Sequence, residues 1–513
     1  MKKIAIGLLV WVSSWASGLE LASPFGEGMV LQQQMPIPVW GWGVAGETIT
    51  VEFAGQKVST TVDKKGRWHC VLPKQEANAQ PQTFTVSEGD QTITYSNVLV
   101  GEVWICFGQS NMQMGYGQVP EVQKLVSDAV AAKQPVRTLN VQTMIALQEA
   151  DRCYGATWNS APPSSAVAAA FACLLQSKIN VPVGIVLTCW GSSSIEGWMP
   201  RDMEEQLPHF KKVMERDLDA DRIALCQKVI DEVQATGKIS YGDDPATQAL
   251  VEKVKARSAN IFCRTRPNLL YNAMLHPLIP MAFRGMVYYQ GEANSKSYEE
   301  MIQYGKTQPL WLKRLHAGWG NDPFFFINIM LPGFGRTLNS GLNVGNLDAV
   351  DTHSWAIIRD AQMNVLKLPR TAVVNTVDLG DEEKIHPTDK MPVGERAARL
   401  ARREVYGESD LLAAGPMFQS LKVSGQKIVI RFKDAKGLST SDGEPPRAFW
   451  LLGSDESGWK PAMAKIVGET VELTIPQGMK PKAIRYAFAA KPNVNLVNQD
   501  GLPAYPFQQE LSR

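Results

Sequence analysis

Three patterns of hydrophobic and polar residues divide the chain. Over residues 19–99, short runs alternate apolar and polar side chains, as at Ile49, Val51 and Phe53, and glycine, proline or polar turns separate the runs. A period of two is typical of half-buried antiparallel strands. We therefore predict a small N-terminal β-sandwich domain. The same alternation returns over residues 413–513, which predicts a second small β domain.

The central part of the chain, residues 100–412, has apolar runs without alternation. The runs read VLVGEVWICF, VPVGIVLTCW, RGMVYY, PFFFINIML and TAVVNTVDL. Strands that helices cover on both faces have this appearance, so we predict the fold class α/β, with a parallel sheet flanked by helices. A charged segment at about 203–262 separates two of the runs, and we predict that it forms a helical insertion.

The first 18 residues have a composition of their own. Lys2 and Lys3 precede an apolar stretch, and small residues follow it. This arrangement predicts a cleavable signal peptide over 1–18, and hence a secreted or periplasmic protein. The alternative is a membrane anchor, which needs about 20 apolar residues and therefore a longer stretch than this one.

Composition and charge exclude several classes of partner. The 513 residues include 52 Lys and Arg against 51 Asp and Glu, which gives a net charge of +1. Such a chain has no long-range field that would gather nucleic acid or an anionic membrane. The seven cysteines are scattered, without a Cys-x-x-Cys pair or zinc-ribbon spacing, so we predict no metal site. Several lie inside apolar runs, which predicts that most are buried thiols.

Polar residues gather where four of the apolar runs end. GQSNM follows the first run, GSSSIEGW the second, QGEANS the third and DLGDEEKIHP the last. In open α/β sheets, ligands bind beyond the carboxyl ends of the strands. A hydroxyl, a glycine amide, a carboxamide and an imidazole at one edge would supply the parts that acyl transfer requires.

Ser110 is the candidate nucleophile in this set. A serine hydroxyl needs an adjacent imidazole to accept its proton, and of the six histidines His276, His353 and His386 are the candidates for that base. We favour His386, which follows the last run just before a predicted helix, whereas His276 lies beside a proline. The alternative for Ser110 is a structural role as the N-cap of the next helix.

An oxyanion needs hydrogen-bond donors that are fixed before the reaction. The backbone amides of Ser110 and Gly191 and the carboxamide of Gln290 are the candidates. The alternative for Gly191 is a tight turn, and for Gln290 a surface loop. Glu292 receives no role.

These motifs also resemble a known family. GQSNM, CWGSSSIEGW, YYQGEAN and IHPTDKMPVGERAARLA resemble, in this order, the SGNH-type esterases of the sialate O-acetylesterase family. The resemblance implies an SGNH-hydrolase-like fold without a metal or organic cofactor. It also implies that Ser110 is the nucleophile, that His386 is the base, and that Gly191 and Gln290 complete the oxyanion hole.

The third member of the triad departs from the family pattern. SGNH enzymes commonly have an aspartate three residues before the histidine, and here that residue is Glu383. A glutamate can orient imidazole through the same hydrogen bond, although its longer side chain needs a different backbone offset. Asp381, Asp378 or a backbone carbonyl are the alternatives.

The resemblance implies removal of O-acetyl groups from sialic acids, but similar proteins deacetylate xylan and other glycans. The carboxylate of a sialic acid favours a guanidinium partner, for which Arg284 and Arg359 are candidates, with a structural salt bridge as the alternative. Trp198 is a candidate for stacking on a sugar, with burial as the alternative. A non-catalytic glycan-binding protein is the competing function, because a fold alone does not fix an activity.

Overall fold

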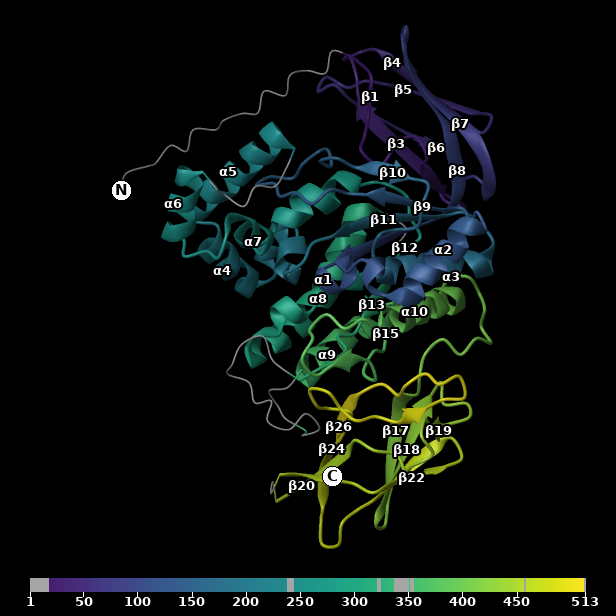
Figure 1. The fold of residues 1–513 in the computed structure, drawn as a ribbon, viewed down its shortest axis with the longest axis vertical. Helices are drawn as coiled ribbons and strands as arrows, with labels where there is room; N and C mark the ends of the chain where they lie inside the picture. Colours follow the sequence, from purple (N-terminus) through teal and green to yellow (C-terminus); the bar gives the residue numbers. More distant parts are fainter. Residues whose placement is uncertain are drawn as a thin grey trace.

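The computed structural model describes residues 18–237, 244–320, 324–335, 350, 355–455 and 458–511. Almost all of the predicted signal peptide and the candidate base His353 lie outside these residues. Figure 1 shows an N-terminal β domain, a central α/β body and a C-terminal β domain arranged along the longest axis of the molecule.

The N-terminal domain is a sandwich of two sheets around one hydrophobic core. One sheet contains β1 (Glu20–Leu21), β3 (Ile37–Trp42) and β6 (Arg67–Leu72). The other contains β2 (Val30–Gln32), β4 (Thr48–Phe53), β5 (Gln56–Thr61), β7 (Asn78–Glu88) and the first half of β8 (Gln91–Gly108). Buried and exposed positions alternate along β3, β4 and β6, as the period of two predicts.

The central body is built on a sheet that confirms the predicted α/β fold class. Its strand order is β10 (Thr157–Asn159), β9 (Val136–Asn140), β11 (Val183–Cys189), β8, β12 (Gly285–Tyr289), β13 (Phe325–Ile329) and β15 (Thr371–Val374). The pairs along this order are parallel, except that the edge strand β10 is antiparallel to β9. The predicted boundary between residues 99 and 100 falls within β8, which belongs to both domains.

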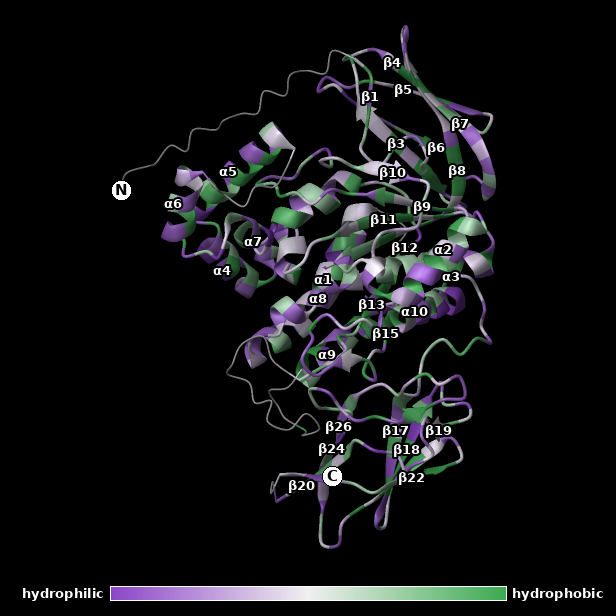
Figure 2. Ribbon diagram, in the orientation of Figure 1, coloured by the Kyte–Doolittle hydropathy of each residue, from purple (hydrophilic) through white to green (hydrophobic). Residues whose placement is uncertain are grey.

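Helices cover both faces of this sheet. Trp104 of β8 packs against Phe171 of α3 (Ala166–Ile179), whereas Phe107 packs against Trp311 of α8 (Tyr298–Trp319). Because successive side chains of a strand point to opposite faces, residues 104 and 107 point to different sides, and so α3 and α8 lie on opposite faces. The other helices of the body are α1 (Ser110–Gln113), α2 (Pro120–Ala131), α9 (Ala356–Gln362) and α10 (Lys390–Glu404). In Figure 2 the central strands are mostly green, as expected for strands covered on both sides.

Helices also occupy the range predicted as an insertion. They are α4 (Pro208–Asp217), α5 (Ala220–Thr236), α6 (Pro245–Lys253) and α7 (Ala259–Arg264), and they form a group at one side of the body in Figure 1. Short 3-10 and π turns connect the body elsewhere: η1 (Tyr116–Gln118), η2 (Ile195–Trp198), η3 (Arg201–Glu205), η4 (Tyr271–Leu275), η5 (His276–Leu278), η6 (Glu292–Asn294) and η7 (Met363–Lys367).

The C-terminal domain has its own hydrophobic core between small antiparallel sheets. One sheet has the order β17 (Met417–Ser424), β18 (Lys427–Lys433), β23 (Thr470–Thr474) and β22 (Ala464–Val467). Another has the order β21 (Trp459–Pro461), β20 (Phe449–Gly453), β24 (Pro481–Tyr486) and β26 (Phe507–Glu510). The short strands β14 (Gly333–Phe334) and β16 (Gly380–Asp381) pair with each other, as do β19 (Ser439–Thr440) and β25 (Leu496–Val497).

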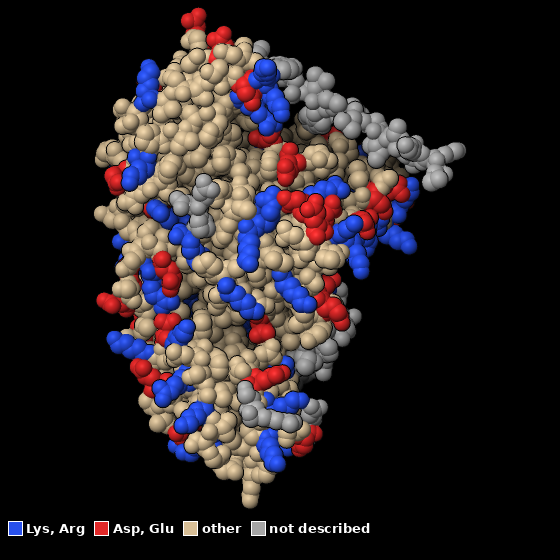
Figure 3. All heavy atoms as spheres, turned by 180° about the vertical axis from the view of Figure 1, so that it is seen from behind, with Lys and Arg blue, Asp and Glu red and all other residues tan. Residues whose placement is uncertain are grey.

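Two further predictions can be compared with the structure. All seven cysteines are buried free thiols, as the apolar runs around them predicted. The face drawn in Figure 3 carries basic and acidic side chains interspersed with one another, in line with the balanced composition. Within the described ranges, no helix is both long and apolar enough to cross a membrane.

Candidate active site

The carboxyl ends of three parallel strands meet at one edge of the sheet. Gly108, the last residue of β8, is in register with Cys189 of β11 and with Tyr289 of β12. Gly108 has a φ of +136°, and a Cβ atom built on it would lie 2.2 Å from the carbonyl oxygen of Tyr289. Only glycine combines this φ with so close a backbone approach. The segments that follow the three strands therefore leave the sheet side by side.

Ser110 and His386 are brought together at this edge. Nε2 of His386 lies 2.7 Å from Oγ of Ser110, although 276 positions separate the residues. Ser110 is the first residue of α1, and the helix has Gln109 as its N-cap without a side-chain capping bond. The hydroxyl of Ser110 thus contacts an imidazole instead of capping a helix. A hydroxyl and an imidazole at this distance are the two groups that nucleophilic catalysis by serine needs.

The surroundings keep His386 neutral at neutral pH. Partial burial lowers the pKa of the imidazole below 6.5, and the positive charge of Lys390 lowers that pKa further. A neutral imidazole can accept a proton, whereas an imidazolium cannot. The electrostatics therefore suit His386 to the role of a general base.

The amide of Gly191 lies beside Ser110 and already has a partner. A Cβ atom built on Gly191 would lie 3.4 Å from Cβ of Ser110, and the backbone N–H of Gly191 donates to Oε1 of Gln113 at 2.8 Å. The side chain of Gln113 is exposed, so an incoming carbonyl group can displace it without disturbing the core. Its amide oxygen has the same sp² geometry as the oxygen of an ester carbonyl.

Gln290 is fully buried behind the turn that carries Ser110. Its Nε2 donates to Oε1 of Gln109 at 3.1 Å and to Oδ1 of Asn294 at 2.8 Å, and its Oε1 accepts from the hydroxyl of Tyr288 at 3.1 Å. These contacts hold the carboxamide against the residue that precedes Ser110. It is not the surface-loop residue of the alternative interpretation. Its participation in an oxyanion hole stays a prediction.

A buried polar network that the sequence analysis missed links the segments of the site. The side chain of Asn111 donates to Oε1 of Glu292 at 2.5 Å and to the carbonyl oxygen of Ile385 at 3.0 Å, and it accepts from Nζ of Lys390 at 2.7 Å. Asn111 follows the candidate nucleophile, and Ile385 precedes the candidate base. The carboxamide of Asn111 therefore joins the turn that carries Ser110 to the loop that carries His386.

The charges in this network are held in an apolar environment. Burial raises the pKa of Glu292, and burial lowers the pKa of Lys390 to about 8. Both side chains are nearly inaccessible to solvent, and Oε2 of Glu292 is buried without a hydrogen-bond partner among the described residues. Burying polar or charged groups costs free energy unless they are hydrogen-bonded or paired. Groups with perturbed pKa values cluster at functional sites.

Two of the candidates for the third triad member have hydrogen-bond partners other than His386. Asp378 accepts two hydrogen bonds from Arg396, each 2.7 Å long, and Oδ1 of Asp381 accepts from the backbone amides of Glu383 and Lys384. These two aspartates thus have structural partners. The role of Glu383 stays a prediction, with Asp381, Asp378 or a backbone carbonyl as its alternatives.

We expect replacement of Glu383 by glutamine to separate these possibilities. If the carboxylate orients His386, kcat should fall by up to about 10⁴-fold, because glutamine keeps the length of the side chain but loses the charge that favours the imidazolium. Steady-state kinetics with a chromogenic acetyl ester measures the change. Glu382→Gln, an exposed neighbour, is the matched control, and equal kcat in both variants would contradict the role of Glu383.

The structure corrects the predicted substrate contacts. The indole of Trp198 is fully buried and donates to Oγ of Ser193 at 3.0 Å, so it cannot stack on a sugar. Arg359 is also fully buried and donates to the carbonyl oxygens of Ala489 and Ala490, so its guanidinium is not available to a carboxylate of a substrate. For Trp198, burial, the alternative interpretation, is correct.

Two further candidates also have structural partners. Arg284 forms a bidentate pair with Glu102 at 2.8 and 2.9 Å, which is the salt bridge of the alternative interpretation. Nδ1 of His276 lies 2.9 Å from the carbonyl oxygen of Ala150, away from the serine turn. Within the part of the chain that the structure describes, no cluster of three or more His, Cys, Asp and Glu side chains is placed to hold a metal ion.

Comparisons with known proteins agree with the geometry. Residues 100–230 match the family model of a carbohydrate esterase, described as a sialic acid-specific acetylesterase. The chain is 26% identical to the sialate O-acetylesterase of Mus musculus, over 85% of this chain and 84% of that relative. It is also 26% identical to the sialate O-acetylesterase of Homo sapiens, over 88% of this chain and 85% of that relative.

A solved structure gives the same result for the fold. The crystal structure of a carbohydrate acetylesterase from Xanthomonas citri is 28% identical to this chain, with a TM-score of 0.77 over 96% of this chain and 100% of that one. The comparisons confirm the resemblance to the sialate O-acetylesterase family and the SGNH-like fold class. They also confirm the predicted class of enzyme, a carbohydrate esterase that hydrolyses carboxylic esters.

Proposed function

We propose that this relative of the sialate O-acetylesterases is a carbohydrate O-acetylesterase that removes O-acetyl groups from sialic acids through an acetyl-enzyme on Ser110. The contact of 2.7 Å between Oγ of Ser110 and Nε2 of His386 carries the proposal. It supplies a hydroxyl and a base that is neutral at neutral pH, at the edge of the sheet where ligands of such folds bind.

The reaction proceeds in two halves. Oγ of Ser110 attacks the acetyl carbonyl carbon while its proton passes to Nε2 of His386, and the carbonyl oxygen becomes an oxyanion. When the carbonyl re-forms, the bond to the sugar oxygen breaks and that oxygen takes the proton from His386. Water then loses a proton to His386 and attacks the acetyl-enzyme, which releases acetate and returns the proton to Ser110.

The oxyanion would be held by groups near the serine turn. The backbone amides of Ser110 and Gly191 lie beside the nucleophile, and the acetyl carbonyl would replace Oε1 of Gln113 as the partner of the Gly191 amide. Each such donor commonly contributes about 10²- to 10³-fold to kcat. Gln290 would add a third donor or, through Gln109, hold the turn in place.

The choice of sialic acids rests on the names of the mammalian relatives and of the family model. One observation favours a second candidate, an esterase acting on xylan or another neutral acetylated glycan. Arg284 and Arg359, the two predicted partners for a sugar carboxylate, are both occupied by protein groups. A neutral substrate would need no such partner.

Release of acetate from a panel of acetylated sugars tests the proposal. We expect kcat/KM for O-acetylated sialic acid to exceed that for acetylated xylan. A clear preference for xylan would overturn the choice of sialic acids but keep the esterase mechanism. No release from any acetyl ester would instead support the competing function, a glycan-binding protein without turnover.

Export to the periplasm or the medium is also part of the proposal. It rests on Lys2, Lys3 and the apolar stretch that follows them, which have the pattern of a signal peptide. N-terminal sequencing of the mature protein would reveal a new N-terminus near residue 18 if this segment is removed.

A further inference from the structure

A groove lies between the N-terminal β domain and the α/β body, and its volume is about 460 Å³. This is within the range of small-ligand sites, about 300–1,000 Å³. One wall is the outer face of the sheet formed by β1, β3 and β6, and the other wall comes from residues 150–151 and 276–280. None of the residues placed in the active site lines this groove.

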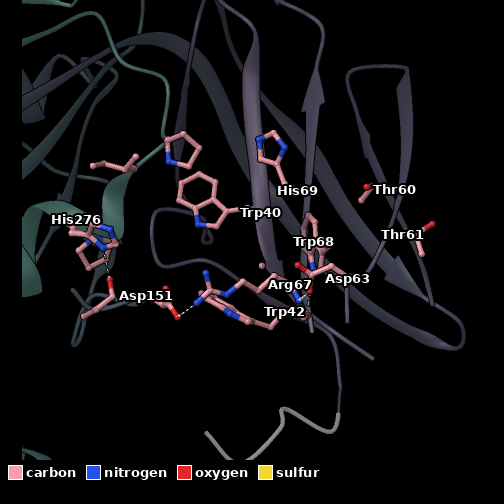
Figure 4. Close-up of a pocket in the computed structure, with 15 residues that line it drawn as sticks. Trp40, Trp42, Thr60, Thr61, Asp63, Arg67, Trp68, His69, Asp151 and His276 are labelled. Atoms are coloured by element: carbon pink, nitrogen blue, oxygen red, sulfur yellow. Dashed lines mark hydrogen bonds and ion pairs between the residues drawn. The ribbon is translucent and has the colours of Figure 1, made fainter. Parts of the chain in front are cut away.

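The sheet wall presents aromatic and polar side chains in a fixed register. Trp40 and Trp42 alternate with buried residues along β3, so both point to the outer face. Trp40 is opposite His69 on β6, and Trp42 is opposite Arg67. Figure 4 shows Trp40 and His69 on neighbouring strands, with His276 and Asp151 on the other side of the groove.

Trp40 is a half-buried indole of this wall. Phe25 supports it from the core side, with ring centroids 5.1 Å apart at an interplanar angle of 78°. The guanidinium of Arg152 already lies 3.5 Å from the ring of Trp42, and the indole of Trp68 is buried. Trp40 is therefore half-buried, packs on Phe25 and lines the groove.

The two walls are joined by an ion pair, and two carboxylates line the groove. Arg67 donates to Oδ2 of Asp151 at 2.7 Å across the groove. Asp63 adds a second carboxylate, so one arginine faces two aspartates. Burial lowers the pKa of His69, which keeps that imidazole uncharged at neutral pH. Thr60 and Thr61 of β5 also line the groove.

We propose that this groove is a non-catalytic binding site for a neutral saccharide, with Trp40 as its stacking platform. The apolar C–H face of a sugar ring packs on an indole, and its hydroxyls need the donors and acceptors that Asp63, His69 and Thr60 offer. A sialic acid is disfavoured, because the arginine of the lining is paired with Asp151 and a second carboxylate, that of Asp63, lies in the same groove. The proposal does not depend on acetyl-ester hydrolysis.

Isothermal titration calorimetry with the full-length Ser110→Ala protein tests the site. This variant lacks the proposed nucleophile and so leaves acetyl groups on the glycans. The probes are a xylo-oligosaccharide, a galactose-terminated oligosaccharide and free sialic acid. We expect at least one neutral probe to bind more tightly than sialic acid. We also expect Trp40→Ala, added to Ser110→Ala, to weaken that binding at least about tenfold.

Two further variants keep the test decisive. His69→Ala removes an exposed side chain of the groove and should also weaken binding, even if Trp40→Ala fails to fold. Val71→Ala, on the outer face of the same strand but outside the groove, should bind as tightly as its parent. A larger loss of binding for sialic acid than for the neutral probes in Trp40→Ala, no binding of any neutral probe, or unchanged binding of that probe in His69→Ala would overturn the proposal.

Discussion

Replacing Ser110 by alanine is expected to lower kcat for acetyl-ester hydrolysis by at least about 10⁴-fold. Alanine removes the oxygen that attacks the ester, and His386 then has no hydroxyl within 2.7 Å to deprotonate. The residual rate would come from the oxyanion donors and from binding alone. Acetate release under saturating substrate measures the loss, and intact-protein mass spectrometry should show an acetyl adduct on the wild type only.

The control for this experiment is another serine. Ser127 is exposed on α2, and its hydroxyl donates to the carbonyl oxygen of Gln123 in the same helix. Ser127→Ala removes the same atom far from the sheet edge and should keep wild-type kcat. If Ser110→Ala retained the rate of Ser127→Ala, the hydroxyl that touches His386 would not be the nucleophile.

Replacing Lys390 by methionine is expected to change both the stability and the pH profile. Methionine fills much of the same volume but leaves Oδ1 of Asn111 without its donor, so the free energy of unfolding should fall by about 1–3 kcal/mol. The loss of a positive charge near His386 should also raise the pKa of the imidazole. Because the base acts only when neutral, the acid limb of kcat/KM should move to higher pH.

The pH profile of kcat/KM separates this effect from simple loss of structure. A variant that is only less stable loses activity at all pH values, whereas a changed charge moves the acid limb along the pH axis. Lys384→Met makes the same charge change on the same loop but at an exposed position, and it should leave the limb where it is. An unmoved limb in Lys390→Met would show that Lys390 does not position or tune His386.

The pairing of Ser110 with His386 could be predicted because it follows from topology and motifs. Parallel strands end at one edge of a sheet, and the polar residues that follow the apolar runs must meet there. The buried network could not be predicted in this way. A lysine at the start of a helix is normally solvent-exposed. Lys390 is buried only because it contacts Asn111, 279 positions away in the chain.

The incorrect substrate contacts have a common physical cause. Arg359 is fully buried on α9, and Trp198, the last residue of η2, packs on Phe107. Both side chains have the chemistry to bind a sugar, but whether a side chain reaches solvent depends on packing between distant segments. The boundary between the first two domains could not be predicted for a similar reason. The change from alternating to continuous apolar residues occurs within β8 and not between two strands.

The length of β8 has a consequence for the distance between the groove and the catalytic serine. The first part of this strand pairs with β2 and β7, and the last part pairs with β11 and β12. The pairing with β2 covers residues 99–101 and the pairing with β11 begins at residue 102, so no loop separates the two domains along this strand. A glycan that bound both the groove and the active site would therefore have to span one fixed distance. This distance would select glycans by their length.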